Sequence, residues 1–171
     1  TPGRIIDHLE KGSLDLSLYP LAYAGGRVPE LNIGLMPALV TSYEQGLRWK
    51  DAPIGKELTR IVEEKGVKIV TWVWQAGGIA SRGKPILQPD DVKGLKFRGG
   101  SKEMDTMLKA AGASPTNVPS SEIYNAMQSG VLDAGLTDVS AAFSRKYFEV
   151  QKFGTVGPIF TIYFHMYANP A

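Results

Sequence analysis

Helical and strand segments alternate along most of this chain, and glycines separate them. Apolar residues recur at helical spacing over 54–65. A β-prone run over 67–74 follows Gly66 directly, and Gly77-Gly78 is expected to end this strand. The same order, a helix end, a glycine and then a strand, returns at Gly12 and at Gly130. Because short turns join each helix to the next strand, the pattern predicts an α/β fold with mainly parallel sheets covered by helices.

Two sequence echoes suggest that the chain is built from two similar halves. The segment 9–15 is similar to 127–133, and the segment 65–68 is similar to 93–96. Each pair has one copy early and one copy late in the chain. We therefore expect two α/β lobes joined near Gly77-Gly78, with a cleft between them that is a favoured place for a ligand.

The echoes also divide the chain. We assign 1–76 to part of lobe I, 77–158 to lobe II, and 159–171 to a strand that crosses back toward lobe I. Lobes on a hinge can close around a ligand, which would suit a binding protein.

Composition excludes several classes of function. A net charge of +2, with scattered lysines and arginines, does not indicate a nucleic-acid partner. The absence of cysteine excludes disulfides, thiolate catalysis and cysteine-ligated zinc. With only His8 and His165, a histidine-rich metal site is also excluded, and we expect neither a metal nor a cofactor. No apolar run approaches the roughly 20 residues that cross a bilayer.

The stretch around Arg98 is the strongest candidate binding site. A short apolar strand ends at Arg98, two glycines follow, and Ser101 is a plausible N-cap of the next helix. A guanidinium matches a carboxylate bidentately, and ligands of open α/β sheets lie beyond the carboxyl ends of strands. The local pattern alone is equally consistent with a surface arginine that pairs with a neighbouring carboxylate.

Other residues are candidates for the same cleft. Tyr19 and Thr137 each end a predicted strand, and Thr137 would lie opposite Arg98. Trp72 and Trp74 share one strand face before the proposed hinge, and we expect one to fill core and the other to wall the cleft. Helix N-termini could add hydroxyls and backbone N–H groups to an anion site, at Ser101 and Ser120.

Catalytic machinery is not visible in the sequence. No serine lies in a Gly-x-Ser-x-Gly elbow, and the paired glycines lack the context that binds phosphates. Asp133 and Asp138 are expected to anchor a strand start and to cap a helix. We therefore predict a protein that is not an enzyme.

Four blocks in register resemble the substrate-binding proteins of tripartite ATP-independent periplasmic (TRAP) transporters, of the dicarboxylate-binding type. The blocks are Asp91-Val92-Lys93-Gly94-Leu95-Lys96-Phe97-Arg98, Gly112-Ala113-Ser114-Pro115-Thr116, Ser121 through Asp133, and Tyr147-Phe148-Glu149-Val150-Gln151-Lys152. The resemblance implies a two-lobed periplasmic-binding-protein-like fold with mixed sheets. It also implies a periplasmic receptor that delivers an organic acid anion to membrane subunits, with Arg98 pairing with the ligand carboxylate.

The chain departs from the family pattern in three ways. Gly78 stands where many members carry an arginine, and Thr137 stands where an asparagine often touches ligand. Pro20 and Ser120 replace residues of sialic-acid binders, so that ligand is not expected. Family members are also longer, which predicts a fragment truncated at both ends, without its signal peptide and prone to self-association.

Two alternative functions stay open at this point. One is a sensor that presents its ligand to a signalling partner, and the other, less favoured, is an α/β enzyme.

Overall fold

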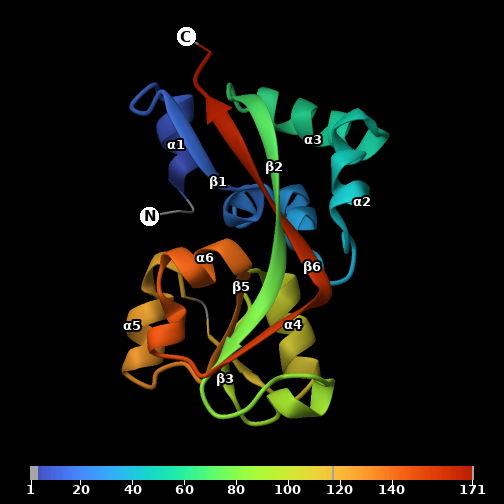
Figure 1. Ribbon diagram of the computed structural model, residues 1–171. Helices are drawn as coiled ribbons and strands as arrows, with labels where there is room; N and C mark the ends of the chain where they lie inside the picture. Colours follow the sequence, from blue (N-terminus) through green and yellow to red (C-terminus); the bar gives the residue numbers. More distant parts are fainter. Residues whose placement is uncertain (1–3, 117, 171) are drawn as a thin grey trace.

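The computed structural model describes residues 4–116 and 118–170, which form one six-stranded sheet flanked by short helices (Figure 1). The strands lie in the order β1-β6-β2-β5-β3-β4. Their bounds are β1 Leu16–Pro20, β2 Lys68–Ser81, β3 Lys96–Arg98, β4 Ser114–Pro115, β5 Ala134–Asp138 and β6 Phe153–Ala168. The α-helices are α1 Ile5–Glu10, α2 Tyr43–Leu47, α3 Pro53–Glu63, α4 Lys102–Ala110, α5 Ile123–Gln128 and α6 Val139–Ser144.

The sheet is mixed. β3 pairs in parallel with β4 and with β5, whereas β2 pairs antiparallel with β5 and β6, and β1 pairs antiparallel with β6. The expectation of mainly parallel pairing was therefore wrong outside β3, β4 and β5. The reason is that the chain enters β6 beside the end of β2, where Phe153 pairs with Ser81, and then runs back along that strand. The mixed sheet implied by the family resemblance is what the structure has.

β2 and β6 are the long elements that connect the two ends of the molecule (Figure 1). The predicted end of this strand at Gly77-Gly78 was wrong, because β2 continues to Ser81. A Cβ at Gly77 would lie 2.6 Å from Phe160, and one at Gly78 would lie 3.0 Å from the Thr155 carbonyl oxygen. These glycines therefore mark a close approach of β6 rather than a strand end. The hinge and the lobe boundaries at 76 and 158 stay predictions.

Buried apolar side chains gather in separate groups at the two ends of the sheet. The upper core packs α1, α3 and the first 3₁₀ turns against β6, and includes Leu9, Leu21, Leu31, Leu58, Val62 and Tyr167. The lower core surrounds β3 and α4, and includes Phe97, Met104, Leu108, Ala134 and Leu136. A smaller group around Ile123, Met127 and Leu132 packs beneath α5. The upper and lower cores are thus joined by β2 and β6, which run through both ends of the molecule.

The helix ends follow the glycine pattern. Gly12, Gly66, Gly112 and Gly130 have φ of +67°, +70°, +88° and +76°, the left-handed region that favours glycine, which confirms their predicted role. Ser101 caps α4 by accepting a hydrogen bond from the backbone N–H of Met104, as predicted. None of the helices in the described ranges has the length and apolar character needed to traverse a bilayer.

Candidate functional site

The site is centred on Arg98, the last residue of β3. Phe97 before it is fully buried in the lower core and fixes the strand, so that Arg98, 6% exposed, projects from the carboxyl edge of the sheet. Arg98 lies beside Gly135 of β5, the neighbouring parallel strand. The predicted delivery of one arginine to a strand end is confirmed.

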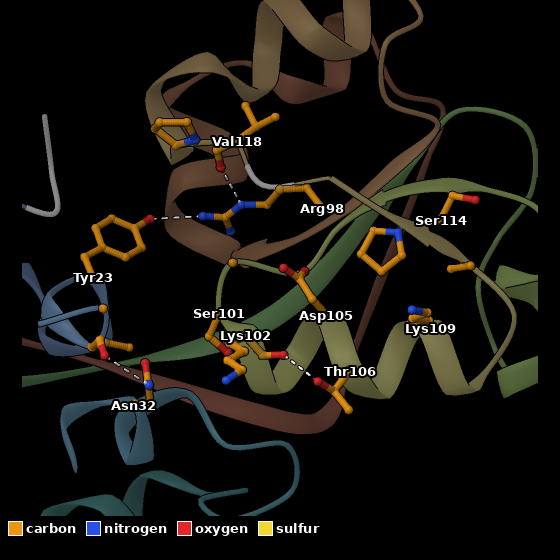
Figure 2. A pocket seen from close by; sticks show the side chains of 17 residues that line it. Tyr23, Asn32, Arg98, Ser101, Lys102, Asp105, Thr106, Lys109, Ser114 and Val118 are labelled. Atoms are coloured by element: carbon orange, nitrogen blue, oxygen red, sulfur yellow. Dashed lines mark hydrogen bonds between the residues drawn. The ribbon is translucent and has the colours of Figure 1, made fainter. Parts of the chain in front are cut away.

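Three hydrogen bonds hold the guanidinium of Arg98 in place. Nε donates to the Val118 carbonyl oxygen over 3.0 Å, and Nη1 donates to the Leu136 carbonyl oxygen over 2.8 Å. Nη2 donates to the hydroxyl oxygen of Tyr23 over 3.0 Å, and Figure 2 shows Tyr23 and Val118 reaching Arg98 from different sides. Since a guanidinium carries five N–H donors, one N–H on each terminal nitrogen is left for another acceptor.

Arg98 is a buried charge that forms no ion pair with a carboxylate of the described residues. None of the ion pairs formed by residues 4–116 and 118–170 includes Arg98 within 4.0 Å. An arginine cannot escape the cost of burial by losing its proton, so a buried guanidinium needs an anion or further acceptors. The alternative of a surface arginine paired with a neighbouring acid is therefore not what the structure contains.

The two glycines after Arg98 are required by the geometry of the loop. Gly100 has φ of +95°, and a Cβ on it would lie 2.7 Å from Nη1 of Arg98. A Cβ on Gly99 would lie 2.2 Å from a carboxylate oxygen of Asp105. Any side chain at either position would displace the charged groups at the centre of the site.

Arg98 lines two cavities. The larger has a volume of about 930 Å³ and lies between the 3₁₀ turns of residues 21–35 and helix α4 (Figure 2). The smaller has a volume of about 340 Å³ and lies between β1, β6 and the start of α6. Tyr23 and Arg98 are the residues common to both linings.

Four more of the predicted residues lie at these cavities. Tyr19, Ser120 and Thr137 line the smaller cavity, and Ser101 lines the larger one. The hydroxyls of Tyr19 and Thr137 are buried and have no hydrogen-bond partner within the described part of the chain. Burial raises the pKa of Tyr19, so its hydroxyl stays neutral and free to donate. The hydroxyl of Ser101 is already engaged, since it donates to the Leu35 carbonyl oxygen over 3.3 Å.

The other predicted residues lie away from Arg98. Trp72 and Trp74 share a strand face as predicted, but both pack on Tyr163, with ring centroids 5.8 and 4.8 Å apart, and neither lines the two cavities at Arg98. Gly78 pairs with Thr137 and lines a third cavity of about 290 Å³. Ligand contacts by these three residues stay predictions.

The sequence reading missed several polar residues at the smaller cavity. Ser140 hydrogen-bonds to the side chains of Gln75 over 2.5 Å and of Asp138 over 2.7 Å, and all three line the cavity together with Arg145. Asp138 also accepts from the backbone N–H of Ala141, which confirms its predicted role as the cap of α6. Gln75 lies inside β2 and Tyr23 inside an apolar turn, and neither position carries a local signal for binding.

Asp105 on α4 is an acid whose charge interacts with that of Arg98. It lines the larger cavity with Arg98 (Figure 2), and its carboxylate lies against Gly99. Burial raises the pKa of the Asp105 carboxyl, the Gly99 N–H and the charge of Arg98 oppose that rise, and the charge of Glu103 adds to it. Asp105 thus lowers the positive potential at Arg98 without pairing with it.

Comparisons with known proteins identify the family of this chain. The model of the bacterial extracellular solute-binding proteins, family 7, matches residues 1–169. A protein of Albidiferax ferrireducens named as a solute-binding protein is 57% identical over 149 residues, which are 87% of this chain and 44% of that relative.

Two solved structures have the same fold. A TRAP periplasmic solute-binding protein of Rhodoferax ferrireducens with bound malonate is 50% identical, has a TM-score of 0.95, and is matched over 98% of this chain and 54% of its own. A TRAP periplasmic solute-binding protein of Roseobacter denitrificans with bound β-D-glucuronate is 25% identical, with a TM-score of 0.88 over 99% of this chain and 57% of its own. The chain spans about half the length of the relatives it matches. The sequence blocks, the α/β fold and the match to the family model all indicate the same family. The chain belongs to family 7 of the bacterial extracellular solute-binding proteins.

Proposed function

We propose that this chain is part of a receptor that binds a small organic acid anion through Arg98. The observation that carries the proposal is the buried guanidinium, which is fixed by three acceptors, lacks a carboxylate partner among the described residues and has N–H groups left to donate. A ligand carboxylate supplies both the opposite charge and a bidentate acceptor. Family 7 consists of solute-binding receptors, which is not an enzyme class.

The relatives support an acid as the ligand. The Rhodoferax protein holds malonate and the Roseobacter protein holds β-D-glucuronate, and each of these ligands has a carboxylate. We further propose that the whole receptor works in the periplasm and passes its ligand to the membrane subunits of a TRAP transporter. The end strands of the described sheet are β1 and β4, and self-association of this chain would occur at such an edge.

Calorimetric titration of malonate and other carboxylates into the full protein tests the proposal. We expect Arg98→Ala to weaken binding by about hundredfold or more, since it removes one partner of a buried charge pair. Arg98→Lys is the matched variant, because it keeps the charge and loses the planar fork, and we expect it to bind weakly as well. Circular dichroism checks that each variant is folded. Undiminished binding by folded Arg98→Ala would exclude Arg98 as the anchor.

A further inference from the structure

Tyr23 meets Arg98 from the opposite half of the molecule. Tyr23 lies in the 3₁₀ turn Leu21–Ala24, and its side chain packs on the upper core, while Ala22 of the same turn packs in the lower core. Arg98 follows Phe97 of the lower core. The other two acceptors of Arg98, the carbonyl oxygens of Val118 and Leu136, come from segments close to β3 and β5. The bond to Tyr23 is therefore the one, of these three, that spans the two halves.

The same pair divides the space beside the sheet. Because Tyr23 and Arg98 are shared by the linings of the 930 Å³ and 340 Å³ cavities, their hydrogen bond lies in the wall between the cavities. A molecule in the smaller cavity that reaches Arg98 also reaches the hydroxyl of Tyr23. Separation of the halves would break this wall and join the two spaces.

The hydroxyl of Tyr23 has a proton left to donate. Its oxygen accepts from Nη2 of Arg98, and within residues 4–116 and 118–170 its own O–H has no recorded acceptor. A hydroxyl is one donor and two acceptors, so it can bond to a guanidinium and to an anion at the same time. Two N–H groups of Arg98 and one O–H of Tyr23 then converge on one carboxylate.

We propose that Tyr23 is a latch, a positioning residue whose hydroxyl ties the upper half to Arg98 and to the bound carboxylate and so holds the receptor closed over its ligand. This inference rests on the proposed function, since it needs an acid at Arg98. It adds a residue of the upper half to a site whose anchor belongs to the lower half. An anion at Arg98 thereby stabilises closure, because it gives the Tyr23 hydroxyl a second, charged partner.

The latch makes a kinetic prediction that separates it from a merely structural tyrosine. A ligand enters the open receptor before Tyr23 engages, so Tyr23→Phe leaves kon for malonate unchanged. The closed complex loses hydrogen bonds to two charged groups, so koff rises by about tenfold or more. Tyr43→Phe is the matched control, because the Tyr43 hydroxyl accepts from the Ala76 N–H over 3.0 Å within the upper part of the molecule.

Stopped-flow binding of malonate to the full protein, with Tyr23→Phe beside Tyr43→Phe, measures both rates. Closure is measured by the distance between two spin labels, since these 171 residues contain no cysteine. Labels at Glu63→Cys in α3 and Gln128→Cys in α5 attach to exposed positions at opposite ends (Figure 1). We expect Tyr23→Phe to lengthen and broaden this distance with malonate bound, and Tyr43→Phe to leave it as in the wild type.

Failure of the latch and failure of the proposed function give different results. If malonate and the other acids do not bind wild type, the receptor function is wrong, and the latch, which needs an acid at Arg98, is wrong with it. If wild type binds and Arg98→Lys weakens binding, but Tyr23→Phe keeps the wild-type koff and label distance, Tyr23 is not a latch. A lowered kon with unchanged koff would likewise overturn the proposal.

Discussion

Two basic side chains are buried within residues 4–116 and 118–170, and their surroundings differ in the acceptors that they offer. His165, fully buried on β6 in the upper core, is surrounded by the rings of Trp72, Tyr163 and Tyr167, with centroids 4.1 to 5.5 Å away. Its Nδ1 is 2.9 Å from the Tyr167 hydroxyl, and its Nε2 has no partner among the described residues. Arg98 is nearly as buried, but three oxygen atoms accept from its guanidinium.

The difference follows from what each group can do with its proton. Burial lowers the pKa of His165 to about 3, so the imidazole is neutral at physiological pH and needs no counter-charge. Arginine cannot take that route, and its surroundings must supply acceptors or an anion instead. Burial of a basic group therefore indicates a binding site only where the group must keep its charge.

The largest effect we expect concerns His165 and pH. Its folded pKa of about 3 lies below the unfolded value of 6.5, so between these values the unfolded chain binds more protons than the folded one. The free energy of unfolding is therefore independent of this histidine above about pH 6.5. It decreases as the pH falls from about 6.5 toward 3, by up to about 1.4 kcal/mol per pH unit. We expect His165→Phe to flatten the free energy of unfolding across this range, as measured by urea denaturation at a series of pH values.

Exposed His8 provides the control for this titration. His8→Gln removes a histidine without changing the aromatic cluster, and we expect it to keep the wild-type slope. The hydroxyls around His165 do not interfere, because burial raises the pKa values of Tyr163 and Tyr167 above their ordinary range. A wild-type slope in His165→Phe would mean that the imidazole is not the group that titrates.

An intermediate effect is expected where the loop approaches Arg98. Gly100→Ala would place a Cβ 2.7 Å from Nη1 at a φ of +95°, so we expect about 1 kcal/mol of lost stability and about tenfold weaker carboxylate binding. Gly94→Ala is the matched variant, since Gly94 has φ of +74° with open space around it. Melting curves and calorimetry should show both variants destabilised and only Gly100→Ala impaired in binding. Equal affinities would show that Nη1 is not part of the site.

The local structure around Arg98 could be predicted from the sequence because it depends on residues that are neighbours in the chain. The short strand, the two glycines and the cap at Ser101 are local, and each one forms as predicted. The strand positions of Tyr19 and Thr137 are also local, and both residues line the smaller cavity with Arg98.

Contacts between residues that are far apart in the sequence could not be predicted. Tyr23 is 75 residues from Arg98, and this pair forms only once the strands between β1 and β3 lie in the order β1-β6-β2-β5-β3. Ser140 is 65 residues from Gln75, and this pair forms only once β2 pairs with β5. The prediction that the strand ends at Gly77 was wrong for the same reason. Its meaning is set by Phe160 on β6 rather than by its own neighbours in the chain, and a local rule therefore ended the strand too early.

The smallest effect we expect tests how much charge Arg98 has left for a ligand. Asp105→Asn keeps an oxygen that can accept from the Gly99 N–H but removes the negative charge that Arg98 feels. We expect malonate to bind about threefold more tightly, because a nearby like charge no longer opposes the incoming carboxylate. Glu103→Gln is the control, since the charge of Glu103 influences Asp105 from the same helix but Glu103 does not line the larger cavity. Calorimetry at low and high salt should show the gain shrink with salt in Asp105→Asn, whereas equal or weaker binding would mean that Asp105 serves only to hold the loop.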